Sequence, residues 1–286
     1  EWYHKKDAVV YTPDPTWPTH RGIATRAGFP WKNYRYYDKS KKGFDLIGML
    51  EDLDTAPNES IIMLHVCAHN PTGCDPSKED WHKILEVCKR KKHLAMFDSA
   101  YQGFASGNLD EDAYSLKLFA DHTDRVMLSQ SFAKNFGLYG ERVGCISVVC
   151  GDEAQQVKVI SRVKGIARPM YSNPPIHGAR IVDIVLSDPA LTASWHQDLL
   201  NMSGRIKEMR SSLVANLASH GSTHDWSHVT SQIGMFAFTG LTPEQVEKLK
   251  ENYHIYLTSD GRISIAGLNT HNIDYISKAF HEVSKG

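Results

Sequence analysis

The clearest sign of architecture lies in residues 61–97, which begin Ile61-Ile62-Met63-Leu64-His65-Val66 and end Leu94-Ala95-Met96-Phe97. Both ends are apolar runs of strand length. Between them, Asp75-Pro76-Ser77 has the composition of a helix start, with proline near the first helical position. Apolar residues then recur at helical spacing, at Trp81, Ile84, Leu85 and Cys88. The pattern predicts a strand, a crossover helix and a second, parallel strand.

The same alternation continues on both sides of this unit. Residues 8–11, 125–128 and 143–149 are further apolar runs of strand length, and residues 153–163 have a helical pattern. Strands that alternate with helices are typical of an α/β domain with a mostly parallel sheet. We therefore predict one large domain of this class over residues 1–200.

After Pro189 the pattern changes to that of one long helix, predicted around residues 190–218. Its apolar residues recur at spacings of three and four, at Trp195, Leu199, Met202, Ile206, Met209, Leu213 and Leu217. We interpret this stripe as core packing, and we expect the helix to join the large domain to a smaller one.

The smaller domain is predicted over residues 201–286, with an α+β pattern. A strand is expected at residues 235–238, and Thr242-Pro243-Glu244-Gln245 has the spacing of a capping box. Residues 255–257 and 262–265 flank an Asp-Gly turn signal, which predicts a hairpin between them. A last amphipathic helix carries Ile273, Ile276, Phe280 and Val283.

Composition limits the classes of partner. The 286 residues carry 32 Lys and Arg against 33 Asp and Glu, a net charge of −1. Nucleic acid and polybasic membrane surfaces need a clustered positive excess, and no run approaches the ~20 apolar residues of a membrane span. We expect the partner to be a small molecule, and we expect neither nucleic acid nor a membrane to be bound.

The five cysteines form an odd set without a C-x-x-C pair, which favours a reducing compartment. We expect Cys145 and Cys150 to be small core residues.

Polar and charged side chains follow three of the predicted strands. Asn70 follows the strand at residues 61–66, Asp98 and Tyr101 follow the next, and Lys134 lies beyond the strand at residues 125–128. Ligands of open α/β sheets bind at the carboxyl ends of the strands. An acid that ends an apolar strand is costly to bury unless it meets a cation or several donors. These residues therefore predict a site at this edge of the sheet.

Together these side chains describe a pocket for pyridoxal 5′-phosphate. Lys134 is able to form an imine with the aldehyde, and Asp98 is able to keep the pyridine nitrogen protonated, so that the ring serves as an electron sink. Tyr101 and Asn70 are able to reach the phenolic oxygen. The phosphate suits two further residues, Ser131 and Arg142, because arginine presents a planar fork of donors.

The sequence disfavours two other classes of site, a metal site and a nucleotide site. His65, Cys67 and His69 alternate along a strand and would share one face as metal ligands. Nothing else in the chain completes such a site, so we expect no metal. A nucleotide-binding protein is excluded because no G-x-G-x-x-G follows the early strands and no Walker-type loop occurs.

The whole chain resembles the aspartate aminotransferases, which are fold-type I pyridoxal phosphate enzymes, and is most similar to their mitochondrial form. Six segments across nearly the full length carry the resemblance: residues 69–73, 97–104, 131–135, 137–144, 171–175 and 260–264. The resemblance implies reversible amino transfer between L-aspartate and 2-oxoglutarate, which gives oxaloacetate and L-glutamate. It also implies a homodimer with shared active sites.

The resemblance assigns cofactor roles to the strand-end residues. Lys134 would be the Schiff-base lysine and the acid and base of proton transfer. Asp98 would pair with the pyridine nitrogen, and Tyr101 and Asn70 would both hydrogen-bond to the phenolic oxygen. The remaining contacts would be Trp17 and Ala100 on the two ring faces, with Ser131 and Arg142 at the phosphate.

For the substrate, the resemblance implies two arginines. Arg262 would hold the α-carboxylate, and Arg168 would reach the side-chain carboxylate in the neighbouring subunit's active site. Two such forks favour a dicarboxylic substrate, because an unpaired desolvated arginine is costly. Asn70 and Trp17 would also contact the substrate. Behind the acid of the site, the resemblance places a hydrogen-bond network of Thr16, His20 and His65.

Compared with the family, the chain lacks roughly the first quarter to third. We therefore expect the large domain to be incomplete at its N-terminus and the protein to be longer. Two alternatives remain: an aromatic or broad-specificity aminotransferase, and a catalytically inert fragment. The expected compartment is the mitochondrial matrix, with the cytoplasm as the alternative.

Overall fold

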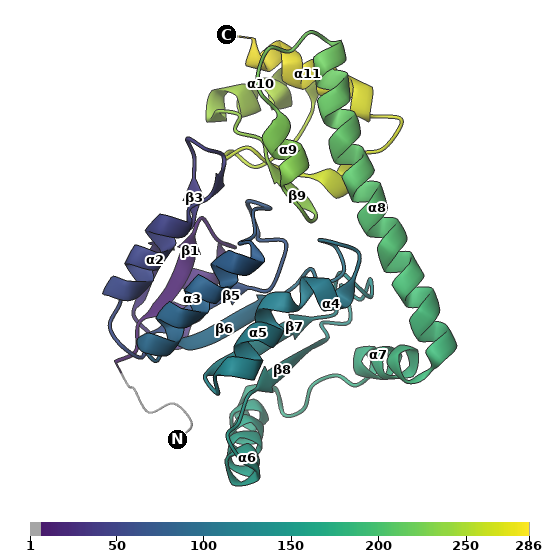
Figure 1. Ribbon diagram of the computed structural model, residues 1–286. Helices are drawn as coiled ribbons and strands as arrows, with labels where there is room; N and C mark the ends of the chain where they lie inside the picture. The colour runs from purple at the N-terminus through teal and green to yellow at the C-terminus, as the bar shows by residue number, and fades with distance from the viewer. Residues whose placement is uncertain (1–6, 286) are drawn as a thin grey trace.

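The computed structural model describes residues 7–285 and contains one main sheet (Figure 1). Within these residues, six strands form it in the order β2-β1-β5-β6-β7-β8. Neighbouring strands are parallel except β7 and β8, which are antiparallel. The strands are β1 (Val10–Asp14), β2 (Trp31–Arg35), β5 (Ile61–His65), β6 (Leu94–Ser99), β7 (Val126–Ser131) and β8 (Gly144–Val148). The predicted α/β class and mostly parallel sheet are confirmed.

Three helices cover the face of the sheet that is turned to the viewer in Figure 1: α2 (Leu46–Thr55), α3 (Lys78–Arg90) and α5 (Tyr114–His122). The crossover helix α3 begins at Ser77, whose side chain accepts from the Asp80 N–H while the Asp80 carboxylate accepts from the Ser77 N–H. The predicted apolar stripe is buried in the main core with Ile62, Leu64 and Phe97 of the sheet. Periodicity therefore identified both the helix and the face that it buries.

Other elements differ from prediction. Strand β2 was not predicted, because in the sequence Trp-Lys-Asn-Tyr-Arg only Tyr34 is buried. The helix expected at residues 153–163 extends further, as α6 (Glu153–Tyr171). Cys145 was expected in the core, but it lies exposed on β8, and Cys150 is half-buried. The part of the chain before the long helix also contains α1 (Thr19–Arg26), β3 (Tyr37–Asp38), β4 (Gly43–Phe44), α4 (Leu109–Asp112) and α7 (His177–Ser187).

The long helix α8 (Pro189–Ser219) runs along one side of the molecule, from α7 to the C-terminal part (Figure 1). Its buried apolar residues are Leu199, Ile206, Met209, Leu213 and Leu217. They join a core with the C-terminal elements α9 (Ser227–Ser231), β9 (Phe236–Phe238), α10 (Pro243–Tyr253), β10 (Arg262–Ser264), η1 (Ile265–Gly267) and α11 (Ile273–Ser284). We propose that the boundary between the two domains lies within α8, near residue 200.

The hairpin predicted from the Asp-Gly signal is wrong. Strand β10 pairs antiparallel with β9, and residues 255–257 form no strand. The turn itself is present, because the Gly261 N–H donates to Thr258 O at 2.9 Å. A turn signal is local, whereas the partner of β10 comes from more than twenty residues earlier in the chain.

In the described part of the chain, no helix combines the length and the apolar character that crossing a bilayer requires.

Candidate active site

A cavity of about 330 Å³ opens at the carboxyl ends of β5, β6 and β7. The parallel register sets His65 beside Asp98 and Asp98 beside Ser129, so neighbouring strands deliver side chains to one edge. The predicted site residues that line the cavity are Trp17, His65, Asn70, Asp98, Ala100, Tyr101, Ser131, Lys134 and Arg142. The lining also includes residues not predicted for the site: Cys67, Gln130, Ala133, Val143 and Gly144.

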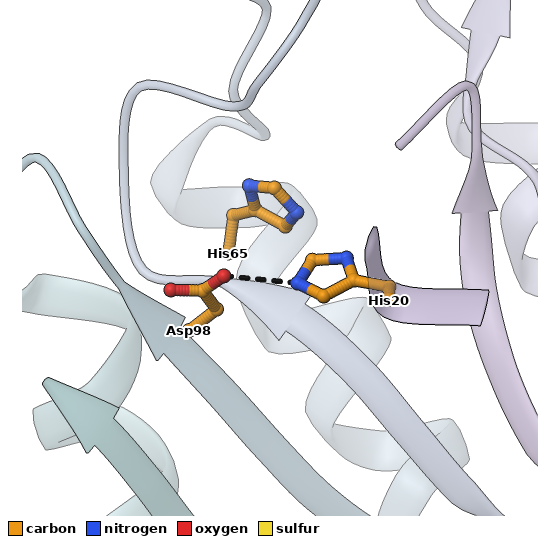
Figure 2. Close-up of side chains that lie close together, drawn as sticks. All are labelled: His20, His65 and Asp98. Carbon is orange, nitrogen blue, oxygen red and sulfur yellow. Dashed lines mark hydrogen bonds and ion pairs between the residues drawn. The ribbon is translucent and has the colours of Figure 1, made fainter. Parts of the chain in front are cut away.

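Asp98 is held at the end of β6 by a histidine, as Figure 2 shows. His20 Nε2 donates to Asp98 Oδ2 at 2.9 Å. Thr16 Oγ1 lies 2.9 Å from His20 Nδ1 and 3.5 Å from His65 Nε2, so these three side chains lie together beside Asp98.

The charge of Asp98 follows from these contacts. Burial alone would raise the pKa of Asp98, but the hydrogen bond from His20 and the electrostatic interactions with the neighbouring histidines and Lys134 outweigh it and lower that pKa below its usual value. The floor of the cavity therefore carries a fixed negative charge. Burial also lowers the pKa of His65 to about 4, so this histidine is neutral at neutral pH.

Lys134 lies in the turn that follows β7. The turn is held by Asn135, whose side-chain amide donates to Gln102 O at 3.3 Å and whose carbonyl accepts from Trp195 Nε1 at 2.7 Å. Lys134 Nζ lies 5.0 Å from the centre of the Tyr101 ring. Burial lowers the pKa of Lys134, and Arg142 adds to that effect while Asp98 opposes it. A lowered pKa increases the fraction of neutral amine, which is the nucleophilic form.

Asn70 lies in the loop after β5 and connects the two halves of the site. The loop is fixed by Asp75, whose carboxylate accepts from the N–H groups of Ala68 and His69 at 2.6 and 2.9 Å. Asn70 Oδ1 accepts from Arg262 Nη1 at 3.0 Å. Arg262, on β10, therefore reaches the edge of the cavity from the C-terminal part of the chain.

Tyr101 follows β6 and lies between Lys134 and this edge. Burial, reinforced by the charge of Asp98, raises the pKa of Tyr101 to about 12. The phenol therefore stays protonated at neutral pH and is able to donate a hydrogen bond.

Ser131 and Arg142 lie where β7 meets the antiparallel β8. Ser131 pairs with Gly144, and a Cβ on Gly144 would lie 2.5 Å from Gln130 O, so only glycine allows this approach. One Nη of Arg142 donates to Tyr139 O at 3.0 Å, and the guanidinium has further donors. With Lys134 close by, the cavity combines two cations with one carboxylate, which suits an anionic ligand.

The remaining predicted residues lie outside the cavity lining. Thr16 and His20 are behind Asp98. Arg168 is exposed on α6, where its Nη1 donates to Ser172 Oγ at 2.8 Å, and it does not reach the cavity of its own chain.

One group near the cavity has the geometry of metal ligands. Among residues 7–285, the ligand atoms of His20, His65 and Asp98 lie within 4.8 Å of one another. His20 and Asp98 already bond each other directly. His65, Cys67 and His69 do not form such a group in this part of the chain, since β5 ends at His65 and His69 Nδ1 lies 2.8 Å from Thr72 Oγ1.

Comparison with known proteins places the chain in a family. Residues 2–280 match the family model for aminotransferase class I and II. The mitochondrial aspartate aminotransferase of Dictyostelium discoideum is 51% identical over 98% of this chain, and the chain spans 66% of the length of that relative.

Two solved structures have the same fold. The mitochondrial aspartate aminotransferase from Trypanosoma brucei has a TM-score of 0.97 and 46% identity, with coverage of 99% of this chain and 74% of that one. The aromatic-amino-acid aminotransferase from Burkholderia pseudomallei, covalently bound to pyridoxal phosphate, has a TM-score of 0.96 and 42% identity, with coverage of 98% and 70%. The extent of the family match and the fold it shares establish that this chain belongs to the aminotransferase class I and II family.

Proposed function

We propose that the chain carries the active site of an aspartate aminotransferase, which moves an amino group reversibly between L-aspartate and 2-oxoglutarate to give oxaloacetate and L-glutamate. One observation carries the proposal: the Lys134 amine and the charged Asp98 carboxylate line one cavity, and Arg262 reaches the edge of that cavity through Asn70. The similarity to aspartate aminotransferases from other organisms supports the choice of reaction.

The donor set fits pyridoxal 5′-phosphate. Asp98 would face the pyridine nitrogen as an anion, because His20 keeps its pKa low. Tyr101 and Asn70 would meet the phenolic oxygen, and Lys134 would meet the aldehyde. The remaining contacts would be Ser131 and Arg142 at the phosphate, with Trp17 and Ala100 on the ring faces. When bound, this cofactor supplies an electron sink for the carbanion at the substrate Cα.

The chain's own residues would supply the proton transfers and the orientation. The Lys134 amine would hold or move a proton at the substrate Cα, and its lowered pKa suits that role. Asp98 would stay ionised throughout and keep the pyridine nitrogen protonated. Tyr101, protonated because its pKa is raised to about 12, would donate to the phenolic oxygen.

Two arginines would select the substrate. Arg262 would hold the α-carboxylate with its planar fork, while Asn70 and Trp17 contact the same molecule. Arg168 would bind the second carboxylate in the neighbouring subunit of a homodimer, since it does not reach the cavity of its own chain.

Exposed apolar side chains on α6 support the dimer. Along α6 the exposed side chains Val157, Ile160, Val163 and Ile166 recur every three residues, and the helix buries no residue against the rest of the described chain. Exposed apolar surface of this kind marks an interaction site. A second copy of the chain is the partner that we propose, and sedimentation or light scattering would give its stoichiometry.

The test is an assay of amino transfer with the protein produced from its complete coding sequence. We expect transfer from aspartate to 2-oxoglutarate in the wild type, loss of transfer in Lys134→Ala, and unchanged transfer in Lys248→Ala. Lys248 is an exposed lysine on α10 and serves as the matched control. Transfer that survives in Lys134→Ala would refute the assignment.

A broader substrate range is the second candidate, because an aromatic-amino-acid aminotransferase shares the fold at 42% identity. The ratio of kcat/KM for aspartate to that for phenylalanine decides between the two, as does the aspartate rate after Arg168→Leu. A catalytically inert chain would show neither visible absorbance from the cofactor nor activity in a sample of verified intact mass.

We propose the mitochondrial matrix as the compartment, with the cytoplasm as the alternative, on the basis of the mitochondrial relatives. Fractionation of cells that express the protein from its complete gene distinguishes the two.

A further inference from the structure

A buried arginine outside the cavity is not explained by the proposed chemistry. Arg210 lies on α8 with 2% of its surface exposed. Among residues 7–285 no carboxylate pairs with it, and its partners are three backbone carbonyls. Its Nη1 donates to Val229 O at 2.8 Å, and its Nη2 donates to Gly234 O at 2.8 Å and to Phe236 O. Burial lowers the pKa of Arg210 to about 10, which expresses the cost of keeping this charge away from water.

The segment that Arg210 holds, residues 229–236, is seated against the loop that carries Asn70. The Ile233 N–H donates to Gly73 O at 2.8 Å. A Cβ on Gly234 would overlap the Ala68 Cβ, so at this contact the segment leaves no room for a larger residue. The guanidinium of Arg210 therefore fixes a contact between the C-terminal part and the edge of the candidate site.

The end of the same segment supports two site residues directly. The Arg262 guanidinium lies over the Phe236 ring, 4.8 Å from its centre. The Tyr101 ring meets the Phe236 ring edge to face, with centroids 5.9 Å apart. Arg262 in turn donates to Asn70 Oδ1. One aromatic ring thus sets the position of both the proposed carboxylate-binding arginine and the proposed phenol donor.

We infer that Arg210 is a positioning residue for substrate binding: by holding the backbone of Gly234 and Phe236, it keeps the Phe236 ring where Arg262 and Tyr101 rest on it. The inference rests on the proposed function. Arginine suits this role because its rigid fork reaches several carbonyls at once, which a lysine ammonium on a flexible stem does not.

The experiment measures the Kd of maleate, an unreactive dicarboxylate, by calorimetry on the holoenzyme, together with the Tm. We expect Arg210→Met and Phe236→Leu each to raise the Kd roughly tenfold, with Arg210→Lys in between. In the double variant Arg210→Met/Phe236→Leu we expect a Kd no higher than about that of the single variant that binds maleate less tightly. Both changes remove the same feature, the Phe236 ring in its place under Arg262.

Arg205→Met is the matched control. Arg205 is on the same helix and also donates to backbone carbonyls, those of Ala266 and Leu268, whereas within residues 7–285 it makes no hydrogen bond to residues 229–236. We expect it to lower the Tm and to leave the Kd of maleate within about twofold of wild type.

The outcomes separate the two levels of inference. If the wild type binds maleate, and Arg210→Met lowers the Tm with the Kd within about twofold of wild type, the positioning role is overturned while the proposed function stands. Fully additive effects in the double variant overturn it as well. If Arg210→Met does not fold, Arg210→Lys and Phe236→Leu decide, and wild-type Kd values in both overturn the inference. If the wild type itself neither binds maleate nor transfers amino groups, the proposed function fails and the inference falls with it.

Discussion

Replacing Asp98 by asparagine removes one charge from the floor of the cavity and changes little else in shape. In the wild type the carboxylate accepts from His20 Nε2 at 2.9 Å, and this hydrogen bond, with the charge of Lys134, lowers the pKa of Asp98 against the effect of burial. The neutral amide of the Asp98→Asn variant would no longer favour a protonated pyridine nitrogen opposite it. The electron sink on which the proposed reaction depends would be weakened accordingly.

The size of the effect follows from the burial of the charge pair that Asp98 would form with the protonated pyridine nitrogen. Removing one partner of a buried charge pair costs about 3–5 kcal/mol. The Asp98 side chain keeps 23% of its surface exposed, so solvent screens part of the interaction. We take the low end, about 3 kcal/mol, which corresponds to about a 10²-fold lower kcat/KM because each 1.36 kcal/mol is tenfold. The assay follows oxaloacetate formation from aspartate and 2-oxoglutarate.

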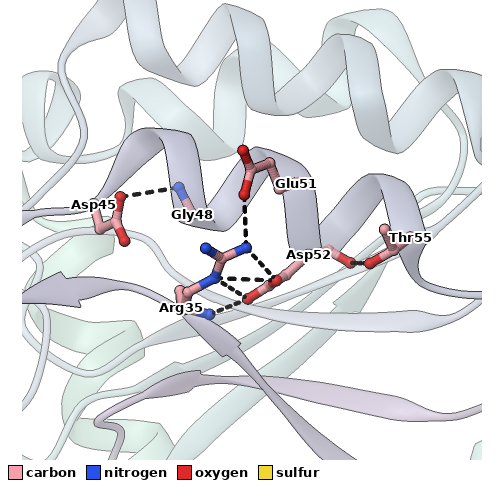
Figure 3. Close-up of polar contacts among 6 residues, drawn as sticks. All are labelled: Arg35, Asp45, Gly48, Glu51, Asp52 and Thr55. Carbon is pink, nitrogen blue, oxygen red and sulfur yellow. Dashed lines mark hydrogen bonds and ion pairs between the residues drawn. The ribbon is translucent and has the colours of Figure 1, made fainter.

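Asp52→Asn is the control for the loss of one negative charge. Asp52 accepts from Arg35 on β2 (Figure 3), and its side chain is 27% exposed, which is close to the value for Asp98. We expect Asp52→Asn to retain wild-type kcat/KM. A kcat/KM for Asp98→Asn within threefold of the Asp52→Asn value would refute the role given to the carboxylate.

Three further predictions concern the substrate, the core and pH. Arg262→Lys is expected to raise the KM for aspartate about tenfold, because a lysine ammonium lacks the planar fork; an unchanged KM would contradict the assignment. Leu213→Ala, at a position with no exposed surface, should lower the free energy of unfolding by about 3–4 kcal/mol in urea titrations, and a loss below about 1 kcal/mol would argue against tight packing along α8. Burial lowers the pKa of His65 to about 4, so the unfolded chain binds more protons than the native state between about pH 4 and pH 6.5. The free energy of unfolding should therefore rise with pH across this window, and His65→Asn should reduce that slope when unfolding is measured at a series of pH values; an identical slope would count against a buried neutral His65.

The parts of the fold that the sequence predicts well are those with a local signal. The stripe that begins at Trp81 predicts helix α3 because side chains three and four residues apart share a face. The hairpin predicted between residues 255–257 and 262–265 was wrong for the complementary reason: the Asp260-Gly261 turn fixes where the chain reverses, but β10 pairs with β9. Strand β2 was missed because its alternation is weak, with one buried side chain in five.

The candidate site divides in the same way. Lys134, Asp98 and Asn70 follow apolar strands, so strand-end position and residue type mark them in the sequence. Phe236 and Arg210 carry no such signal. Their contribution depends on which carbonyls and rings lie nearby once α8 and β9 have packed, and those contacts join residues far apart in the chain.

The most direct test of the central claim is borohydride reduction of the purified holoenzyme, followed by peptide mapping. Reduction fixes the cofactor to the amine that holds it, and mass spectrometry then identifies the residue. We predict a single modified peptide in which Lys134 carries the reduced cofactor. An unmodified Lys134 in protein that transfers amino groups, or a cofactor fixed to a different lysine, would contradict the account.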